Sequence, residues 1–215
     1  GHIISRRYRS CLNLVPRMEE NYSHIIKAYK ALNSDAKSGR SVIAAAEWLF
    51  DNFYIVEEQV KEIRMNFPKG CSGKLPCLKE GLLKGFPRVY DIALELVSHT
   101  DSRIDESLLC DFIKSYQSKS QLTDSELWAL PLMLKMALIE NIRHICDSML
   151  KSQEMRRLSD KLADIIIDGE DNSEKLLEDI RAYTDGMDEI SSAFAENLLI
   201  RIRRYGDDSG PALHY

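Results

Sequence analysis

The residues best suited to chemistry in this sequence are one histidine with a nearby carboxylate and one acidic helix face. His99 and Asp101 stand two residues apart, a spacing at which a carboxylate could orient an imidazole that acts as a general base. Glu47, Asp51 and Glu58 recur near one face of a predicted helix, and two carboxylates that flank a sugar can hydrolyse a glycosidic bond. The dipole at a helix C-terminus also favours histidine, and acidic helix faces are usually solvated, so we prefer these structural interpretations.

The sequence holds none of the motifs that carry nucleophilic, nucleotide-binding or metalloprotease chemistry. A nucleophile elbow, a P-loop, a dinucleotide fingerprint and a His-Glu-x-x-His pair are all missing. The formal net charge is −5, with 29 Lys and Arg against 34 Asp and Glu, so a basic footprint for nucleic acid is absent as well. We therefore predict no catalytic residue, no bound cofactor, no metal ligand and no nucleic-acid partner.

One aromatic stripe offers a possible binding surface. Trp48, Asn52, Ile55 and Gln59 are spaced by three or four residues, beside the apolar face of the same predicted helix. An aromatic ring flanked by amides could stack on a sugar ring. The alternative, which we prefer, is that this stripe packs against a neighbouring helix.

The five cysteines are an odd number, and most fall inside helical patterns. This usage predicts free buried thiols and a reducing compartment. Cys71 and Cys77 flank a Gly/Pro-rich loop, so a loop disulfide or a metal there stays open as an alternative. Their spacing does not fit a zinc knuckle, and no histidine lies nearby.

The elements that must position these residues are helices. Apolar residues recur every three or four positions along most of the chain, and strand-like alternation is nearly missing. Gly39 ends a predicted helix over 17–37, and Ser41 is expected to cap a second helix that Pro68 ends. After the loop 69–86, predicted to be the least regular internal segment, Pro87 opens a third helix that runs to about His99.

The second half of the chain continues the helical pattern. Asp105 is expected to cap a helix that ends near 117, and Thr123 and Glu126 have the spacing of a capping box. Pro131 should kink or restart the helix that follows, whose apolar period runs to about Ile166. Later helices are predicted over 173–183 and 187–204, followed by a linker over 206–210.

Together these patterns predict an all-α bundle of about seven helices without a sheet. A helical domain is expected over 1–168, with a C-terminal helical pair and a truncated linker over 169–215, packed on the first domain. The longest apolar stretch, 127–139, falls short of the roughly 20 residues that span a bilayer, so no membrane span is predicted. Gly1 and His2 suggest a cloning remnant on an excised piece of a larger protein.

Three stretches of the chain resemble segments of the cyclic β-1,2-glucan synthases. The stretch 44–59 (AAAEWLFDNFYIVEEQ) is similar to the pattern A-E-W-L-x-D-N-[FY]-x-[LIV]-x-E-Q near the start of these enzymes. The stretch 86–101, from Phe-Pro-Arg-Val-Tyr to Ser-His-Thr-Asp, resembles a second segment, and 116–143 resembles a third. Their order and spacing also match, so the resemblance covers about residues 16–146.

The resemblance implies a very large, membrane-embedded, processive glucosyltransferase that uses UDP-glucose and carries a C-terminal phosphorylase-like region. It implies that this stretch lies ahead of the glycosyltransferase domain, on the cytoplasmic side of a bacterial inner membrane. None of the family's catalytic residues fall in the three segments. The expected partners are the remaining domains of the parent polypeptide, with β-glucan as a further candidate.

The predicted function is therefore a non-catalytic scaffold or regulatory domain of such a glycosyltransferase. The alternative is a stand-alone helical sugar-binding module or a small enzyme. Charged residues beside apolar positions are expected to form a partly buried network with Arg88 and Arg143 as cationic centres, or else to line a glucan or nucleotide site. The residues predicted for this network or interaction surface are Trp48, Asn52, Glu57, Glu58, Arg88, Glu95, His99, Asp101, Trp128, Glu140 and Arg143.

Overall fold

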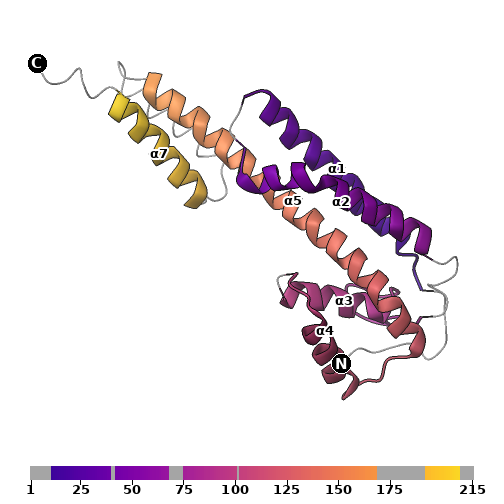
Figure 1. Ribbon diagram of the computed structural model, residues 1–215. Helices are drawn as coiled ribbons and strands as arrows, with labels where there is room; N and C mark the ends of the chain where they lie inside the picture. Colours follow the sequence, from indigo (N-terminus) through magenta and orange to yellow (C-terminus); the bar gives the residue numbers. More distant parts are fainter. Residues whose placement is uncertain (1–10, 40–41, 68–74, 101, 169–191, 209–215) are drawn as a thin grey trace, which may run out of the picture. The chain divides into compact units, whose positions relative to one another are not determined.

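The computed structural model describes residues 11–39, 42–67, 75–100, 102–168 and 192–208. Within these ranges the chain forms six α-helices and no β-strand, and a single isolated bridge joins Cys77 to Pro87. The predicted all-α fold is confirmed (Figure 1). The helix expected over 173–183 lies outside the described residues.

Helices α1 (Val15–Lys37) and α2 (Ala44–Asn66) lie side by side (Figure 1). Their shared core follows the predicted three- and four-residue spacing, and Tyr29 of α1 packs on Phe53 of α2 with ring centroids 4.3 Å apart. Helix α2 buries Ala46, Leu49, Val56, Val60 and Ile63.

The start of α2 differs from the prediction. The N-cap is Ile43 in an extended conformation, without a side-chain hydrogen bond, and Ser41, the predicted cap, lies outside the described residues. Ile43 contributes only its carbonyl, which accepts from the amide of Ala46 at 2.9 Å. The other end agrees with expectation, because α2 stops at Asn66, two residues before Pro68.

Residues 75–87 form a compact turn region that is hydrogen-bonded to the segment 11–14, which precedes α1. The amide of Leu12 donates to the carbonyl of Gly85 at 2.8 Å, and the amide of Gly85 donates to the carbonyl of Leu78 at 2.9 Å. Gly85 has a φ of +87°, and a Cβ there would lie 3.1 Å from a methyl carbon of Leu12. Both features require glycine at position 85. This part of the predicted irregular loop is therefore held by backbone hydrogen bonds.

A disulfide joins Cys11 to Cys77, with 5.6 Å between their Cα atoms. The prediction of free thiols is wrong for these two residues, because the fold brings together positions that are 66 residues apart. The loop pairing of Cys77 with Cys71 is excluded for the same reason, and Cys71 itself lies outside the described residues. Cys110 and Cys146 are free thiols, the first exposed and the second buried.

Helix α3 (Arg88–His99) is the most enclosed of the helices, with seven of its twelve residues buried. Pro87 precedes it as the N-cap residue. Helix α4 (Glu106–Gln117) begins as predicted, because the Asp105 side chain accepts a 2.8 Å hydrogen bond from the amide of Leu108.

Helix α5 (Asp124–Asp168) runs for 45 residues and passes through Pro131 without a break. The predicted restart is therefore absent. Pro131 lies in the second turn, where the loss of one amide removes a single bond from a long ladder.

The chain divides into two compact units, 1–147 and 148–215, and the boundary falls within α5. In the second unit, Arg201 of α7 (Ser192–Asp208) bonds Asp164 at 2.7 Å. Gly206, expected in a linker, belongs to α7. The predicted boundary at 168/169 adjoins residues outside the described ranges and stays a prediction. In the ranges that the structure covers, no helix has the length and apolarity to cross a membrane.

Candidate functional site

Glu140 is the centre of a buried hydrogen-bonded cluster that joins α1, α3 and α5. Arg17 donates to both carboxylate oxygens, at 2.7 Å from Nε and 2.5 Å from Nη2. The Tyr90 hydroxyl donates at 2.5 Å and the Asn21 amide at 3.2 Å. The Arg17 guanidinium also lies 5.6 Å from the ring centroid of Phe86. Four donated hydrogen bonds therefore occupy a carboxylate that is 6% exposed.

The electrostatics of this cluster favour the ionised carboxylate. Burial alone would raise the pKa of Glu140, but the hydrogen bonds from Arg17, Tyr90 and Asn21 outweigh it and lower the pKa. The hydrogen bond to Glu140 raises the pKa of Arg17. Burial, with the adjacent carboxylate, raises the pKa of the Tyr90 hydroxyl. Each proton thus stays on its donor, and Glu140 is not poised to act as a general acid.

Arg88 is the centre of a second cluster. Its guanidinium forms a two-pronged pair with Glu126, with Nε–Oε1 at 2.9 Å and Nη2–Oε2 at 2.7 Å. It also donates to the Ser120 hydroxyl at 2.9 Å and to the Gln121 carbonyl at 3.0 Å. Arg88 is 1% exposed and Glu126 is fully buried. The Arg88–Glu126 pair joins α3 to the first turn of α5, and the bonds to Ser120 and Gln121 join α3 to the α4–α5 connection. This cluster therefore has a structural role.

Glu126 also completes the predicted capping box of α5. The amide of Thr123 donates to its carboxylate at 2.9 Å, and the Thr123 hydroxyl lies 3.3 Å from the Glu126 amide. The capping box expected from the sequence is confirmed. Its carboxylate therefore serves two tasks, because the same oxygens bind Arg88.

Arg143 does not centre a network. Its Nε lies 3.1 Å from Asp147 on the same helix, and both side chains are about one-third exposed. The expectation of a second cationic centre is therefore wrong for Arg143, and Arg17 takes that role with Glu140. Arg17 was missed because no local pattern links it to a residue 123 positions away.

The remaining charged residues of the predicted set are peripheral. Glu95 and His99 pair along α3 at 3.1 Å, with side chains 56% and 75% exposed. Glu57 is half-buried beside Tyr22 and contributes to raising the pKa of that hydroxyl, after burial. Glu58 is exposed, and Asp101 lies outside the described residues. Among the described residues, the carboxylate that pairs with His99 is therefore that of Glu95, its exposed neighbour on α3. The structure shows no second described carboxylate that forms a catalytic pair with His99.

The predicted aromatic residues are exposed. Trp48 is 58% exposed, and Asn52 donates a hydrogen bond to the Trp48 carbonyl at 2.8 Å within α2. The preferred packing interpretation is therefore wrong for Trp48, because α2 packs on α1 through a different face. Trp128 is 86% exposed on α5.

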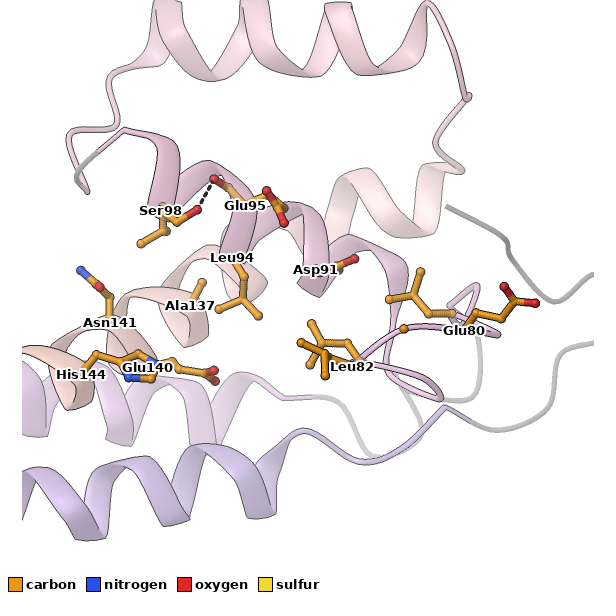
Figure 2. A pocket seen from close by; sticks show the side chains of 14 residues that line it. Glu80, Leu82, Asp91, Leu94, Glu95, Ser98, Ala137, Glu140, Asn141 and His144 are labelled. Carbon is orange, nitrogen blue, oxygen red and sulfur yellow. Dashed lines mark hydrogen bonds between the residues drawn. The ribbon is translucent and has the colours of Figure 1, made fainter. Parts of the chain in front are cut away.

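A half-open cavity of about 450 Å³ lies between α3, the turn at 78–83 and the middle of α5. Figure 2 shows Leu94, Glu95 and Ser98 on one wall, with Glu140, Asn141 and His144 on the other. Four carboxylates line it, from Glu80, Asp91, Glu95 and Glu140, and no Lys or Arg occurs among its described lining residues. Like charges repel, so this lining disfavours a nucleotide diphosphate. No cluster suited to a metal ion occurs in the described part of the chain.

No family model matches the chain. It is 34% identical over 201 residues to the cyclic β-(1,2)-glucan synthase NdvB of Rhizobium meliloti, an alignment that covers 92% of this chain. The predicted resemblance to a cyclic β-1,2-glucan synthase is confirmed. The chain spans about 7% of the length of that synthase.

Two of the three segments that resemble glucan synthases contain residues of the buried clusters. Arg88 belongs to the second segment, while Glu126 and Glu140 belong to the third. Arg17 and Asn21, the partners of Glu140, lie on α1, within the same region of resemblance. The two buried clusters of the first unit therefore fall within the region that resembles glucan synthases, about residues 16–146.

Proposed function

We propose that this chain is a non-catalytic helical scaffold region of a glucan-synthase-type glycosyltransferase that polymerises glucose from UDP-glucose. Its task is to dock on the remaining domains of the parent polypeptide and to support the transferase. The similarity to NdvB supports the relation to a glucan synthase. The scaffold role goes beyond that similarity and is our inference from the clusters.

The observation that carries the scaffold role is the saturation of the buried charges. Glu140 accepts from three side chains of this chain, and Glu126 accepts from Arg88 and Thr123. Acid–base catalysis needs a group that can reach a substrate and exchange a proton. Carboxylates held in this way instead lock helices in one arrangement.

A direct test is to incubate the 215-residue chain with UDP-glucose and with β-1,2-linked glucose oligomers and to follow product by chromatography. We expect neither hydrolysis nor elongation. The matched arm is the parent enzyme carrying Arg88→Ala, in which we expect glucan synthesis to fall because the scaffold is destabilised. Turnover by the chain alone that disappears on changing one acidic residue would falsify the proposal.

The cytoplasmic placement on a bacterial inner membrane stays part of this proposal, although the Cys11–Cys77 disulfide favours an oxidising compartment, and the bond provides the test. Disulfides persist in oxidising compartments and are rare in a reducing cytosol. Cells can be quenched with acid and alkylated before lysis, and peptides with Cys11 and Cys77 then identified by mass spectrometry. Alkylated thiols at both positions support the cytoplasmic side, whereas an intact bond places this region in an oxidising compartment.

A further inference from the structure

A groove of about 340 Å³ lies between the C-terminal end of α2 and the first turns of α5. This volume is at the lower end of the range of small-molecule sites, about 300–1,000 Å³. The groove is lined by Glu62 and Asn66 of α2 and by Ser125, Trp128, Ala129, Pro131, Leu132 and Lys135 of α5.

Trp128 is the dominant feature of this groove. It lines the hollow and yet remains 86% exposed, so a large flat apolar face is presented to solvent beside a concave surface. Ser125, Trp128 and Leu132 share one face of α5 because they are three and four residues apart. Ala129 also lines the groove and is buried, and its small side chain occupies little of the hollow.

The polar groups of the groove carry no net charge. The Lys135 ammonium lies 2.6 Å from the Glu62 carboxylate, so the two charged side chains among the described lining residues neutralise each other. Asn66 and Ser125 supply both donors and acceptors. A charged ligand therefore gains little electrostatic energy in this groove. A neutral ligand with many hydroxyl groups finds both hydrogen-bond donors and hydrogen-bond acceptors there.

We propose that this groove binds a neutral oligosaccharide, with Trp128 as the stacking platform. A pyranose ring has a C–H face that fits an indole and a rim of hydroxyl groups that both donate and accept hydrogen bonds. The identity of the sugar as a β-glucan rests on the proposed function. The preference for a neutral saccharide rests on the lining alone.

The two tryptophans of the sequence make the proposal measurable by fluorescence. In Trp48→Ala, all indole emission comes from Trp128, so titration with β-1,2-linked glucose oligomers should change its intensity with a saturable curve. In Trp128→Ala, the remaining emission should not respond. Calorimetry should show affinity at least ~10-fold weaker in Trp128→Ala than in Trp48→Ala, the loss that removal of a central aromatic contact produces.

Trp48→Ala is the matched control, because it removes an indole that is also exposed but does not line the groove. Both variants should have the same midpoint of thermal unfolding as the parent, because neither indole ring is buried. Trp128→Phe keeps an aromatic face and should bind with an affinity between parent and Trp128→Ala. UDP-glucose should bind no more tightly than the neutral oligomers.

Three outcomes would overturn the inference. One is that the parent chain binds no oligosaccharide, and another is that Trp128→Ala binds as well as Trp48→Ala. The third is that Trp128→Ala instead weakens association with the rest of the parent polypeptide, which would make the groove a protein interface. None of these outcomes affects the scaffold proposal, which is tested separately by turnover of UDP-glucose or glucose oligomers and by Arg88→Ala in the parent enzyme.

Discussion

The two arginines expected to centre a charge network differ in what their removal should cost. Arg88→Ala leaves the Glu126 side chain buried without its guanidinium partner, so we expect a loss of about 3–5 kcal/mol in the free energy of unfolding. Arg143→Ala breaks a partly exposed pair within one helix and should cost less than about 1 kcal/mol. Chemical denaturation followed by circular dichroism measures both, and equal losses would contradict this assignment.

Glu140 should make the protein sensitive to acid. Its folded pKa is lowered, so the unfolded chain binds the proton more readily and stability falls as pH drops through the folded value. The contribution is fully present above the unfolded pKa, so the loss should begin below about pH 5 and grow as the pH falls further.

The test compares the midpoint of thermal unfolding for the parent and for Glu140→Gln across this pH range. Glu19, whose pKa is lowered by its hydrogen bonds with Arg64, titrates in both proteins and therefore cancels in the comparison. The parent curve should slope more steeply than that of the variant. Parallel curves would show that Glu140 has an ordinary pKa in the folded state.

At the scale of elements, the double use of Glu126 predicts coupling between α3 and the cap of α5. Thr123→Ala and Arg88→Ala act on the same carboxylate, so their effects on the free energy of unfolding should depart from additivity by at least about 0.5 kcal/mol. Asp105→Ala removes the cap of α4, whose bond goes to Leu108 instead. We expect it to cost about 1 kcal/mol and to add to Arg88→Ala without coupling.

A double-mutant cycle over Thr123 and Arg88, with Asp105 and Arg88 as the reference cycle, measures this difference. Additive effects in both cycles would mean that Glu126 serves the cap and the guanidinium independently. In that case α3 and α5 would not be joined through this side chain.

At the scale of the whole molecule, the Cys11–Cys77 disulfide closes 66 residues that include α1 and α2. A cross-link of this span restricts the unfolded chain, so reduction should lower the free energy of unfolding by about 2–4 kcal/mol. Cys11→Ser should reproduce the effect of the reductant and show no further response to it. An unchanged melting curve under reductant would indicate that the bond does not form in solution.

Native alkylation supplies the control for this experiment. Cys110 is exposed and should react readily. Burial, with the nearby Asp147 charge, raises the pKa of the Cys146 thiol to about 11, so Cys146 should stay unmodified until the chain unfolds. Rapid modification of Cys146 in the folded chain would show that α5 opens locally.

The helices were predictable because their signals are local. The cap at Asp105, the capping box of Thr123 and Glu126, and the three- and four-residue apolar spacing are each contained within a few residues. The resemblance to glucan synthases was also readable from contiguous segments, as the similarity to NdvB shows.

Only the tertiary structure decided which charges meet. Arg17 and Glu140 are 123 residues apart, and Cys11 and Cys77 are 66 apart, so no local pattern pairs them. Arg143 and Arg88 look alike in sequence, each charged beside apolar neighbours, but packing buries one and leaves the other part-exposed. Burial depends on how distant helices pack together, and this is why the sequence could nominate such residues but could not assign their partners.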